Sequence, residues 1–469
     1  MKHTERVKIR IGPWYVAFSL LAITGLASCG ESEPEQLAVR PNVILILADD
    51  LGYETVTSNG GESYETPFVD QLASEGMRFE HCYAQPQCTP SRVQLLTGIY
   101  NVRNYVRFGE LDTSQTTLAQ LFRESGYVTG VAGKWQLGRN PDNPVKLGFD
   151  DYLVWQLTES RVDSIGWDPE RFPGQGYQAG GRDNRYSQPV LDLNGKIVPT
   201  DREDYGPKLL NDFSLDFIER NSEANKPFFL FYSMILTHCP FSPTPDSPDY
   251  MENDTAVMSY KGDVRYFGDM VNYMDKMVGN IDRKLQELGI AENTILIFTG
   301  DNGTDTPVVS RFQNRDVAGA KFMSTDAGTR VPLVVKWPGV VKPGVVNSEL
   351  VDFTDFMPTM LEAANVKIPD SLNIDGVSYL PQLKGEMENT RDWIYSWFQF
   401  PGRDNPRVFA RNQQYKLYDT GEFYQVSADY LEESPIPFDS LSEPLKTTYS
   451  ELQKVLDDYS KRRLDAIKN

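Results

Sequence analysis

The feature that most constrains the fold is a series of short, uninterrupted apolar runs separated by helical patterns. These runs lie at residues 43–47, 128–132, 228–235, 294–298 and 331–335. A strand without polar residues on either side is buried on both faces, which is typical of a largely parallel sheet covered by helices. The sequence therefore predicts an α/β fold that begins at about residue 41.

Two of the intervening segments have clear helix boundaries. Thr66 is predicted to cap a helix that has Pro67 in its first position and Gly76 after its last turn. Apolar side chains then recur at helical spacing between residues 263 and 288, and the pattern stops at Gly289. We therefore expect a long amphipathic helix there, with its apolar face in the core.

The chain changes character after about Gly385. Aromatic residues dominate residues 393–398 and 415–418, a pattern of short antiparallel strands. A helical pattern follows at residues 445–466. We therefore predict a large domain at residues 41–385 and a C-terminal subdomain at residues 386–469, with a small antiparallel sheet and a terminal helix.

The first 40 residues have the pattern of an export signal. Basic residues precede an apolar run at residues 14–26, which is short for a membrane span. The run ends in a Leu-Ala-Ser-Cys sequence at Cys29 that resembles the lipobox of bacterial lipoproteins. We predict a signal peptide at residues 1–28, lipidation of Cys29 and a polar tether at 29–40; the alternative is an ordinary cleavage site with an incidental cysteine. The protein would then be an exported lipoprotein of the bacterial envelope, in the periplasm or on the outer-membrane surface, with only its lipid in the membrane.

Charge and composition exclude several classes of function. Acidic residues outnumber basic ones by 66 to 46, which gives a net charge of −20, so the chain lacks the positive field that nucleic-acid binding requires. Its 4 cysteines and 3 histidines are too few for a disulfide framework, a cysteine-rich zinc module or a histidine-rich metal cage. A chain of 469 residues with 40% hydrophobic content is instead expected to form a sizeable packed core.

Acidic and amide side chains follow two of the predicted strands. Asp49 and Asp50 come after the first apolar run, and Asp301 and Asn302 come after the run at 294–298. Ligands commonly bind at the carboxyl ends of parallel strands, which meet at one edge of the sheet. Three carboxylates and one amide suit Ca²⁺ or Mg²⁺ better than zinc. Taken alone, such a pair usually belongs to a turn or a helix cap.

A cysteine stands at the start of another predicted helix. Cys88 is followed by Pro90 in the first turn and by Arg92 one turn later. The N-terminus of a helix offers unpaired N–H groups and a positive dipole, and therefore suits an anionic tetrahedral group. The alternative for a single cysteine is a small buried side chain beside a helix cap.

Together these segments resemble the formylglycine-dependent (type I) sulfatases of the alkaline phosphatase-like superfamily. In that family a maturation enzyme oxidises the cysteine of a Cys-X-Pro-Ser-Arg motif to formylglycine, and Cys88 to Arg92 match the motif. The other matches follow in the family's order from Pro41 to about Leu383, at residues 49–53, 133–138, 237–240, 301–303, 319–321 and 328–332. The resemblance implies an alkaline phosphatase-like α/β/α sandwich with a mostly parallel central sheet, and hydrolysis of sulfate esters.

The resemblance also implies a metal site and a modified residue. A Ca²⁺ ion, with Mg²⁺ less expected, would bind a sulfate oxygen and the formylglycine, and its protein ligands would be Asp49, Asp50, Asp301 and Asn302. The formylglycine would be made from Cys88. The expected partners are the formylglycine-generating maturation enzyme and a sulfated carbohydrate substrate.

The remaining matched residues would take part in substrate binding and proton transfer. Arg92 would steady the formylglycine, while Lys134 and Lys321 would hold the sulfate ester. His238 is the expected acid for the departing alcohol, because the pKa of histidine lies nearest to working pH. Arg139 is a further candidate for substrate binding.

One position departs from the family pattern. Where most members have a histidine, this chain has Gln136, whose amide can orient a hydroxyl group but cannot titrate. The proton could pass instead to His238, to a metal-bound carboxylate or to water. Alternatively the site handles a phosphate or phosphonate ester, or it is a weakened enzyme that only binds a sulfated glycan.

The substrate and the remaining cysteines are open at this stage. An anchored, exported sulfatase favours a sulfated polysaccharide or its oligomers over a small aryl sulfate. Residues near the matched segments that could contact sugar carboxylates or rings, or could simply be solvated, are Arg139, Arg311, Arg315, Trp135 and Trp155. Cys82 and Cys239 could form a disulfide or stay reduced, and His81, in a strand-like segment, is assigned to structure.

Overall fold

The computed structural model describes residues 40–155, 185–187, 189–201, 203–250, 261–386, 390–403 and 405–463, which belong to one compact unit. The predicted signal peptide, Cys29 and the tether up to residue 39 lie outside these residues. Across the described ranges, no helix is both long and apolar enough to cross a membrane.

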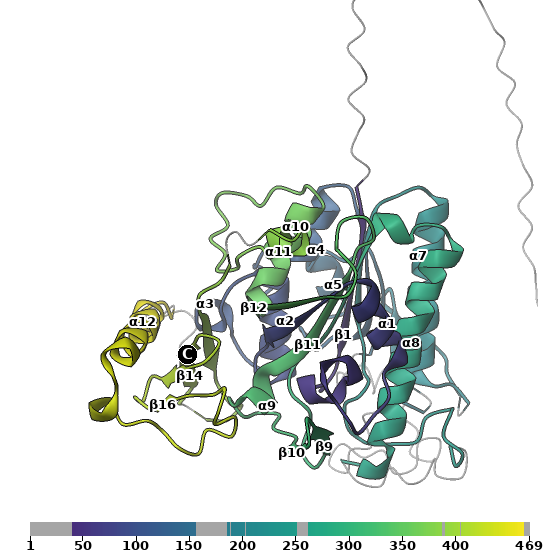
Figure 1. The fold of residues 1–469 in the computed structure, drawn as a ribbon. Coiled ribbons are helices and arrows are strands. Elements are labelled where there is room, and N and C mark those ends of the chain that lie inside the picture. Colours follow the sequence, from purple (N-terminus) through teal and green to yellow (C-terminus); the bar gives the residue numbers. More distant parts are fainter. Residues whose placement is uncertain are drawn as a thin grey trace, which may run out of the picture. The chain divides into compact units, whose positions relative to one another are not determined.

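A ten-stranded sheet forms the centre of this unit, with helices on both faces (Figure 1). Its strand order is β12-β2-β11-β8-β1-β7-β3-β4-β5-β6. The strands are β1 (Asn42–Ala48), β2 (Met77–Tyr83), β3 (Val128–Lys134), β4 (Asp151–Trp155), β5 (Leu191–Leu193), β6 (Lys196–Ile197), β7 (Phe228–Ser233), β8 (Thr294–Gly300), β11 (Arg330–Lys336) and β12 (Val345–Asp352). Strands β8, β1, β7, β3 and β4 run parallel, so the predicted α/β fold with a mostly parallel sheet is confirmed.

One predicted strand runs in the opposite direction. Strand β11 pairs antiparallel with both β8 and β2. An uninterrupted apolar run indicates burial on both faces and carries no information about direction. The direction of β11 therefore follows from its connections and could not be predicted from its residues.

The two faces of the sheet bury separate cores. Along β1, Val43 and Leu45 pack into one core, whereas Ile44 and Ile46 pack into the other. The first core contains α2 (Cys88–Thr97), α4 (Leu118–Glu124) and α10 (Phe356–Ala363), and the second contains α1 (Pro67–Glu75), α7 (Gly206–Glu223) and α8 (Phe267–Glu287). The short helices are α3 (Asn101–Asn104), α5 (Asn143–Lys146), α9 (Asp326–Thr329) and α11 (Leu380–Leu383). Alternate residues of β1 thus serve opposite layers of the sandwich.

Helix α1 begins at Pro67, as predicted, but its cap differs from the prediction. The side chain of Thr66 does not cap the helix; its hydroxyl donates to Thr57 Oγ1 at 3.1 Å. The carboxylate of Asp275, in α8, instead accepts from the backbone N–H groups of Phe68 at 3.0 Å and Val69 at 2.8 Å. The two helices are therefore joined at the N-terminus of α1.

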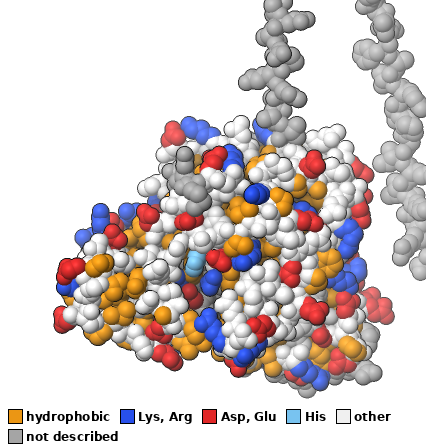
Figure 2. Space-filling model, viewed as in Figure 1, with side chains coloured by type: hydrophobic (Ala, Val, Ile, Leu, Met, Phe, Trp, Pro, Cys, Tyr) orange, Lys and Arg blue, Asp and Glu red, His pale blue; other side chains and the backbone are white. Residues whose placement is uncertain are grey.

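The C-terminal part contains the expected small antiparallel sheet. Its strands, in order, are β13 (Ile394–Phe398), β14 (Arg407–Arg411), β15 (Lys416–Tyr418) and β16 (Phe423–Tyr424), and α12 (Glu443–Ser460) follows. Hydrophobic side chains gather over this part in Figure 2, and Leu431 and Phe438 are about half exposed. The domain boundary after Gly385 stays a prediction.

Candidate active site

The two acidic pairs lie side by side because β1 and β8 are neighbouring parallel strands whose last residues are paired. Asp50 donates its backbone N–H to Asp301 Oδ1 at 3.0 Å, and Asn302 Nδ2 donates to Asp50 Oδ1 at 2.8 Å. Asp49, Asp50, Asp301 and Asn302 are all fully buried. The sheet therefore brings all four predicted metal ligands to one edge.

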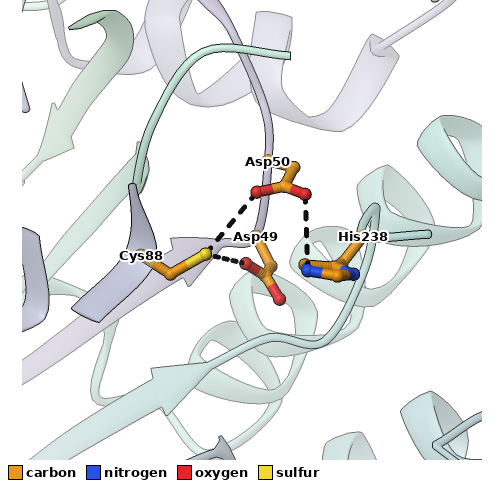
Figure 3. A group of neighbouring side chains, drawn as sticks. All are labelled: Asp49, Asp50, Cys88 and His238. Carbon is orange, nitrogen blue, oxygen red and sulfur yellow. Dashed lines mark hydrogen bonds and ion pairs between the residues drawn. The ribbon is translucent and has the colours of Figure 1, made fainter. Parts of the chain in front are cut away.

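Cys88 and His238 face the same carboxylates (Figure 3). Cys88 is the first residue of α2, and its Sγ lies 3.4 Å from Asp49 Oδ1 and 3.6 Å from Asp50 Oδ1. His238 Nε2 lies 3.6 Å from Asp50 Oδ2. Ligand atoms of these four residues all lie within 4.8 Å of one another. The structure thus places the predicted nucleophile and the predicted acid on either side of the acidic pair.

Three buried cations each face one of the carboxylates. Lys134 Nζ lies 2.8 Å from Asp49 Oδ2, and Lys321 Nζ lies 2.6 Å from Asp50 Oδ2. Arg92 reaches Asp301 Oδ2 with its Nη2 atom at 2.9 Å. Three carboxyl groups and three buried cationic groups therefore face one another in the site.

The carboxylates have very different proton affinities. Burial would raise the pKa of Asp49, but Lys134 and Arg92 hold it at about 2. Burial and the neighbouring Asp49 raise the pKa of Asp301 to about 7, against the influence of Arg92. Closely packed carboxylates repel one another, and a divalent cation among them would relieve this repulsion.

The donor set fits a hard divalent cation. Among the described residues, Asn302 Oδ1 is a buried acceptor without a hydrogen-bond partner. Together with the carboxylate oxygens of the three aspartates it offers the all-oxygen set that Ca²⁺ and Mg²⁺ prefer. A methyl group at Gly303 would lie 1.9 Å from the carbonyl oxygen of Ala327, so only glycine fits beside this amide.

His238 is held by a residue that no sequence motif indicated. Arg185 Nη1 lies 2.8 Å from His238 Nδ1, and that nitrogen also lies 2.5 Å from the carbonyl oxygen of Cys239. A guanidinium group only donates, so the first contact favours a proton on Nε2, whereas the second favours a proton on Nδ1. Burial and the nearby Lys321 lower the pKa of His238, while Asp50 raises it.

Gln136 follows β3 two residues after Lys134. Its backbone has a φ of 50°, the left-handed region that side chains rarely adopt. In the part of the chain that the structure describes, its buried Oε1 atom has no hydrogen-bond partner. A left-handed backbone and a buried acceptor without a partner both occur at functional positions.

Ser233 is a second residue that the sequence did not indicate. Arg92 donates through Nη1 to Ser233 Oγ and to the carbonyl oxygen of Lys134, and Ser233 Oγ donates to that carbonyl at 2.6 Å. Ser233 is the last residue of β7, between β1 and β3 in the sheet. It therefore holds Arg92 in place through the neighbouring strands.

The residues considered for contacts with sugars differ in their accessibility. Trp135 is 1% exposed and packs against Phe149. Arg139 is exposed, and Trp155 is half-buried with the Arg185 guanidinium 4.2 Å from its ring centre. Arg311 and Arg315 lie on the exposed hairpin of β9 (Val309–Phe312) and β10 (Arg315–Ala318).

The other cysteines and His81 have structural surroundings. Cys82 and Cys239 are both buried and free, so the structure corresponds to the reduced alternative. His81 lies in β2 and stacks on the ring of Tyr83, with ring centres 6.3 Å apart. It lies outside the group around Asp49 and Asp50.

Comparison with known proteins identifies the class to which this fold and this group of residues belong. A family model described as Sulfatase matches residues 41–366, and one described as N-sulphoglucosamine sulphohydrolase, C-terminal, matches residues 319–460. The chain belongs to the sulfatase family and is a sulfuric ester hydrolase. It is 32% identical to N-acetylgalactosamine-6-sulfatase of Mus musculus over 85% of this chain and 74% of that protein. It is 30% identical to arylsulfatase A of Bos taurus over 91% of this chain and 86% of that protein.

Solved structures share the fold. The protein Ps i-CgsB, solved in complex with k-i-k-neocarrahexaose, superposes with a TM-score of 0.71 at 23% identity, covering 91% of this chain and 94% of that one. A protein solved with its substrate D-glucosamine-2-N,6-O-disulfate has a TM-score of 0.70 at 23% identity, covering 90% and 98%. The phosphonate monoester hydrolase of Agrobacterium radiobacter has a TM-score of 0.63 at 22% identity, covering 91% and 96%.

Proposed function

We propose that this sulfatase removes sulfate from a sulfated polysaccharide or its oligosaccharides, with a formylglycine made from Cys88 and a Ca²⁺ ion in its site. The observation that carries the proposal is the convergence of Cys88, three carboxylates, Asn302 and three buried cations at one sheet edge. Two of the solved structures described above contain a carbohydrate, and the name of the mouse relative includes an amino sugar, which supports a sugar substrate.

The cation is assigned to Asp49, Asp50, Asp301 and Asn302. When bound, it would draw negative charge from the sulfate oxygens as the ester breaks, and the hydrated formylglycine would supply the attacking hydroxyl group. Lys134 and Lys321 each form an ion pair with one of these carboxylates. With a cation bound to the carboxylates, the two ammonium groups would bind the sulfate oxygens. Arg92, in α2, forms an ion pair with Asp301 and so fixes the position of this carboxylate relative to the helix.

His238 is assigned as the acid for the departing sugar alcohol. Its Nε2 atom faces Asp50, at the side of the site opposite Cys88. Arg185 contacts the ring at 2.8 Å and the hydroxyl of Tyr186 donates to the carbonyl oxygens of Ile235 and His238, so both ring and backbone are held. An acid fixed in this way would give its Nε2 proton to the leaving oxygen.

We also propose that the protein reaches its substrate as an envelope lipoprotein anchored through Cys29, with a catalytic domain at residues 41–385 and a subdomain at 386–469. The Leu-Ala-Ser-Cys sequence after an apolar run supports the anchor. Incorporation of labelled fatty acid into the native chain, and its loss in Cys29→Ala, would test this part separately.

The first experiment tests the nucleophile and the substrate class together. The protein is produced with a formylglycine-generating enzyme, position 88 is examined by peptide mass mapping, and sulfate release is measured on a panel of sulfated glycans. We expect an aldehyde at position 88 and sulfate release that Cys88→Ala abolishes. An unmodified thiol at position 88 in a competent host would contradict the proposal and favour a glycan-binding protein.

A phosphonate or phosphate ester hydrolase is the second candidate, and one observation favours it. Gln136 cannot act as a general base, which removes a group that most sulfatases are thought to use to regenerate the aldehyde. Rates on matched aryl phosphonate and aryl sulfate esters separate the two activities. Much faster cleavage of the phosphonate would replace the sulfatase assignment.

A further inference from the structure

One buried hydroxyl group connects the two acidic loops, which are the loop that carries Asp49 and Asp50 and the loop that carries Asp301 and Asn302. Thr304, two residues after Asn302, is fully buried. Its Oγ1 atom accepts the backbone N–H of Gly52 at 3.1 Å and donates to Glu54 Oε1 at 2.5 Å. Gly52 and Glu54 belong to the loop that begins with Asp49 and Asp50. Thr304 thus adds a further link between the two loops that supply the proposed metal ligands, beside the hydrogen bonds of Asp50 with Asp301 and Asn302.

Glu54 is a buried acid that the proposed mechanism does not use. It is 5% exposed, and a methyl group at Gly52 would lie 2.4 Å from its Oε2 atom. The carboxyl group therefore packs directly against the loop backbone, where it accepts the hydroxyl of Thr304. This buried acid thus has a hydrogen-bonding partner on the opposite loop.

The backbone of Thr304 serves the same site. Its carbonyl oxygen accepts the N–H of Lys321 at 3.0 Å, and Lys321 Nζ faces Asp50. Thr304 consequently contacts both acidic loops and the segment of one sulfate-binding lysine. None of these contacts involves a ligand atom of the proposed metal site.

We propose that Thr304 and Glu54 are a positioning pair that fixes the distance between the two acidic loops and so determines how tightly the site holds its cation. The inference rests on the proposed Ca²⁺ site. A cation held by two loops requires their oxygens at closely defined distances, and outer hydrogen-bonding partners of metal ligands typically change metal affinity by about 10–100-fold. The pair acts through the ligands and touches no reacting atom.

The test measures Ca²⁺ affinity directly. The matured protein is stripped of metal with a chelator and titrated with Ca²⁺ in a calorimeter. Thr304→Val keeps the shape of the side chain and removes its hydroxyl, so we expect the Kd for Ca²⁺ to rise about 10–100-fold. Thr304→Ser restores the hydroxyl and should restore the affinity, which a role in packing alone would not.

Glu54 gives a second, independent pair of variants. Glu54→Leu removes the acceptor and is expected to weaken Ca²⁺ binding in the same way as Thr304→Val. Glu54→Gln keeps an acceptor oxygen for the Thr304 hydroxyl, so its Kd should stay close to that of the unchanged protein. This pair tests the inference if Thr304→Val fails to fold.

Thr359 provides a matched control far from the acidic loops in the sequence. It is 1% exposed, its hydroxyl donates to the carbonyl oxygen of Asp355 at 2.6 Å, and it accepts the N–H of Tyr379 at 2.9 Å. Thr359→Val should lower thermal stability without changing the Kd for Ca²⁺. An unchanged Kd in Thr304→Val, or an equal change in Thr359→Val, would overturn the inference. Absence of Ca²⁺ binding by the unchanged protein would instead overturn the proposed metal site, and the inference with it.

Discussion

Gln136 stands where the resemblance to the sulfatases predicts a histidine in most members. Its backbone is left-handed, and its buried Oε1 atom has no hydrogen-bond partner in the described ranges. Oε1 is therefore free to accept a hydrogen bond from a bound or modified group. A hydroxyl group on position 88 is the donor that the proposed chemistry would supply. Gln136 would then orient that hydroxyl while another group takes the proton.

We predict that Gln136→Ala lowers kcat about tenfold on the glycan substrate, because one hydrogen bond to a reacting group contributes about 1–1.5 kcal/mol. Steady-state kinetics of sulfate release by protein with confirmed aldehyde at position 88 would measure this. A change in KM alone would show that Gln136 binds substrate and does not orient the nucleophile.

The sequence indicated the site residues that lie in compact motifs and missed those that approach from elsewhere. Cys88, Asp49 and Asp301 each follow a helix or strand boundary that the pattern of residues makes visible. Arg185 and Ser233 carry no such signal, because they reach the site only through the pairing of β7 with its neighbours and through the contact with His238. These contacts arise from the tertiary fold, which a local pattern does not encode.

At the scale of elements, the start of α1 depends on α8. Asp275 accepts two N–H groups of α1, and burial raises the pKa of Asp275 to about 6 although these N–H groups oppose the shift. The folded protein therefore holds the Asp275 proton more tightly than the unfolded chain does. The resulting stabilisation is complete below about pH 4, the ordinary pKa, and is lost as the pH rises through about 6.

We predict that the free energy of unfolding of Asp275→Asn rises relative to that of the unchanged protein between about pH 4 and pH 7, by up to about 3 kcal/mol. The asparagine amide does not titrate. It has one acceptor oxygen, so it accepts only one of the two N–H groups as well as the carboxylate does. Urea unfolding of both proteins at several pH values checks this. If the difference in free energy of unfolding between the two proteins does not vary with pH, Asp275 has the same pKa in the folded and the unfolded state, and the prediction is wrong.

Element boundaries were predicted best where a residue type marks them. Pro67 begins α1 as expected, and the last residues of β1 and β8 coincide with the predicted strand ends to within two residues. Thr66 is the residue that precedes α1, as predicted, but its hydroxyl does not cap the helix because it donates to Thr57 Oγ1 instead. Side chains from distant segments compete for such local hydrogen bonds, and the tertiary packing decides which hydrogen bond forms.

At the scale of the whole unit, a buried ion pair joins the C-terminal part to the segment just before α10. Arg391 donates through Nε to Asp355 Oδ2 at 2.9 Å and through Nη1 to the hydroxyl of Tyr100 at 2.8 Å. Tyr100 follows α2, the helix that begins with Cys88. Ser396 of β13 donates to Gln85, which lies just before the same helix. The C-terminal part is therefore connected to the segments on either side of the nucleophile helix.

We predict that Arg391→Leu lowers the free energy of unfolding by about 3–5 kcal/mol, because it leaves Asp355 buried without its partner. Thermal unfolding would measure this loss. Arg462→Ala is the matched control, since Arg462 lies on the ring of Tyr459 in the same part of the chain with its side chain 44% exposed. Equal losses in both variants would contradict the special role of the buried pair.

The charge balance of the site has a consequence for the order in which the protein is assembled. Asp49, Asp50 and Asp301 are matched by Lys134, Lys321 and Arg92, so the interior carries little net charge before any cation arrives. Folding therefore need not wait for the metal. The chain can acquire its tertiary structure first and be loaded later, wherever the ion is abundant, and loading then turns a neutral interior into one that attracts anions.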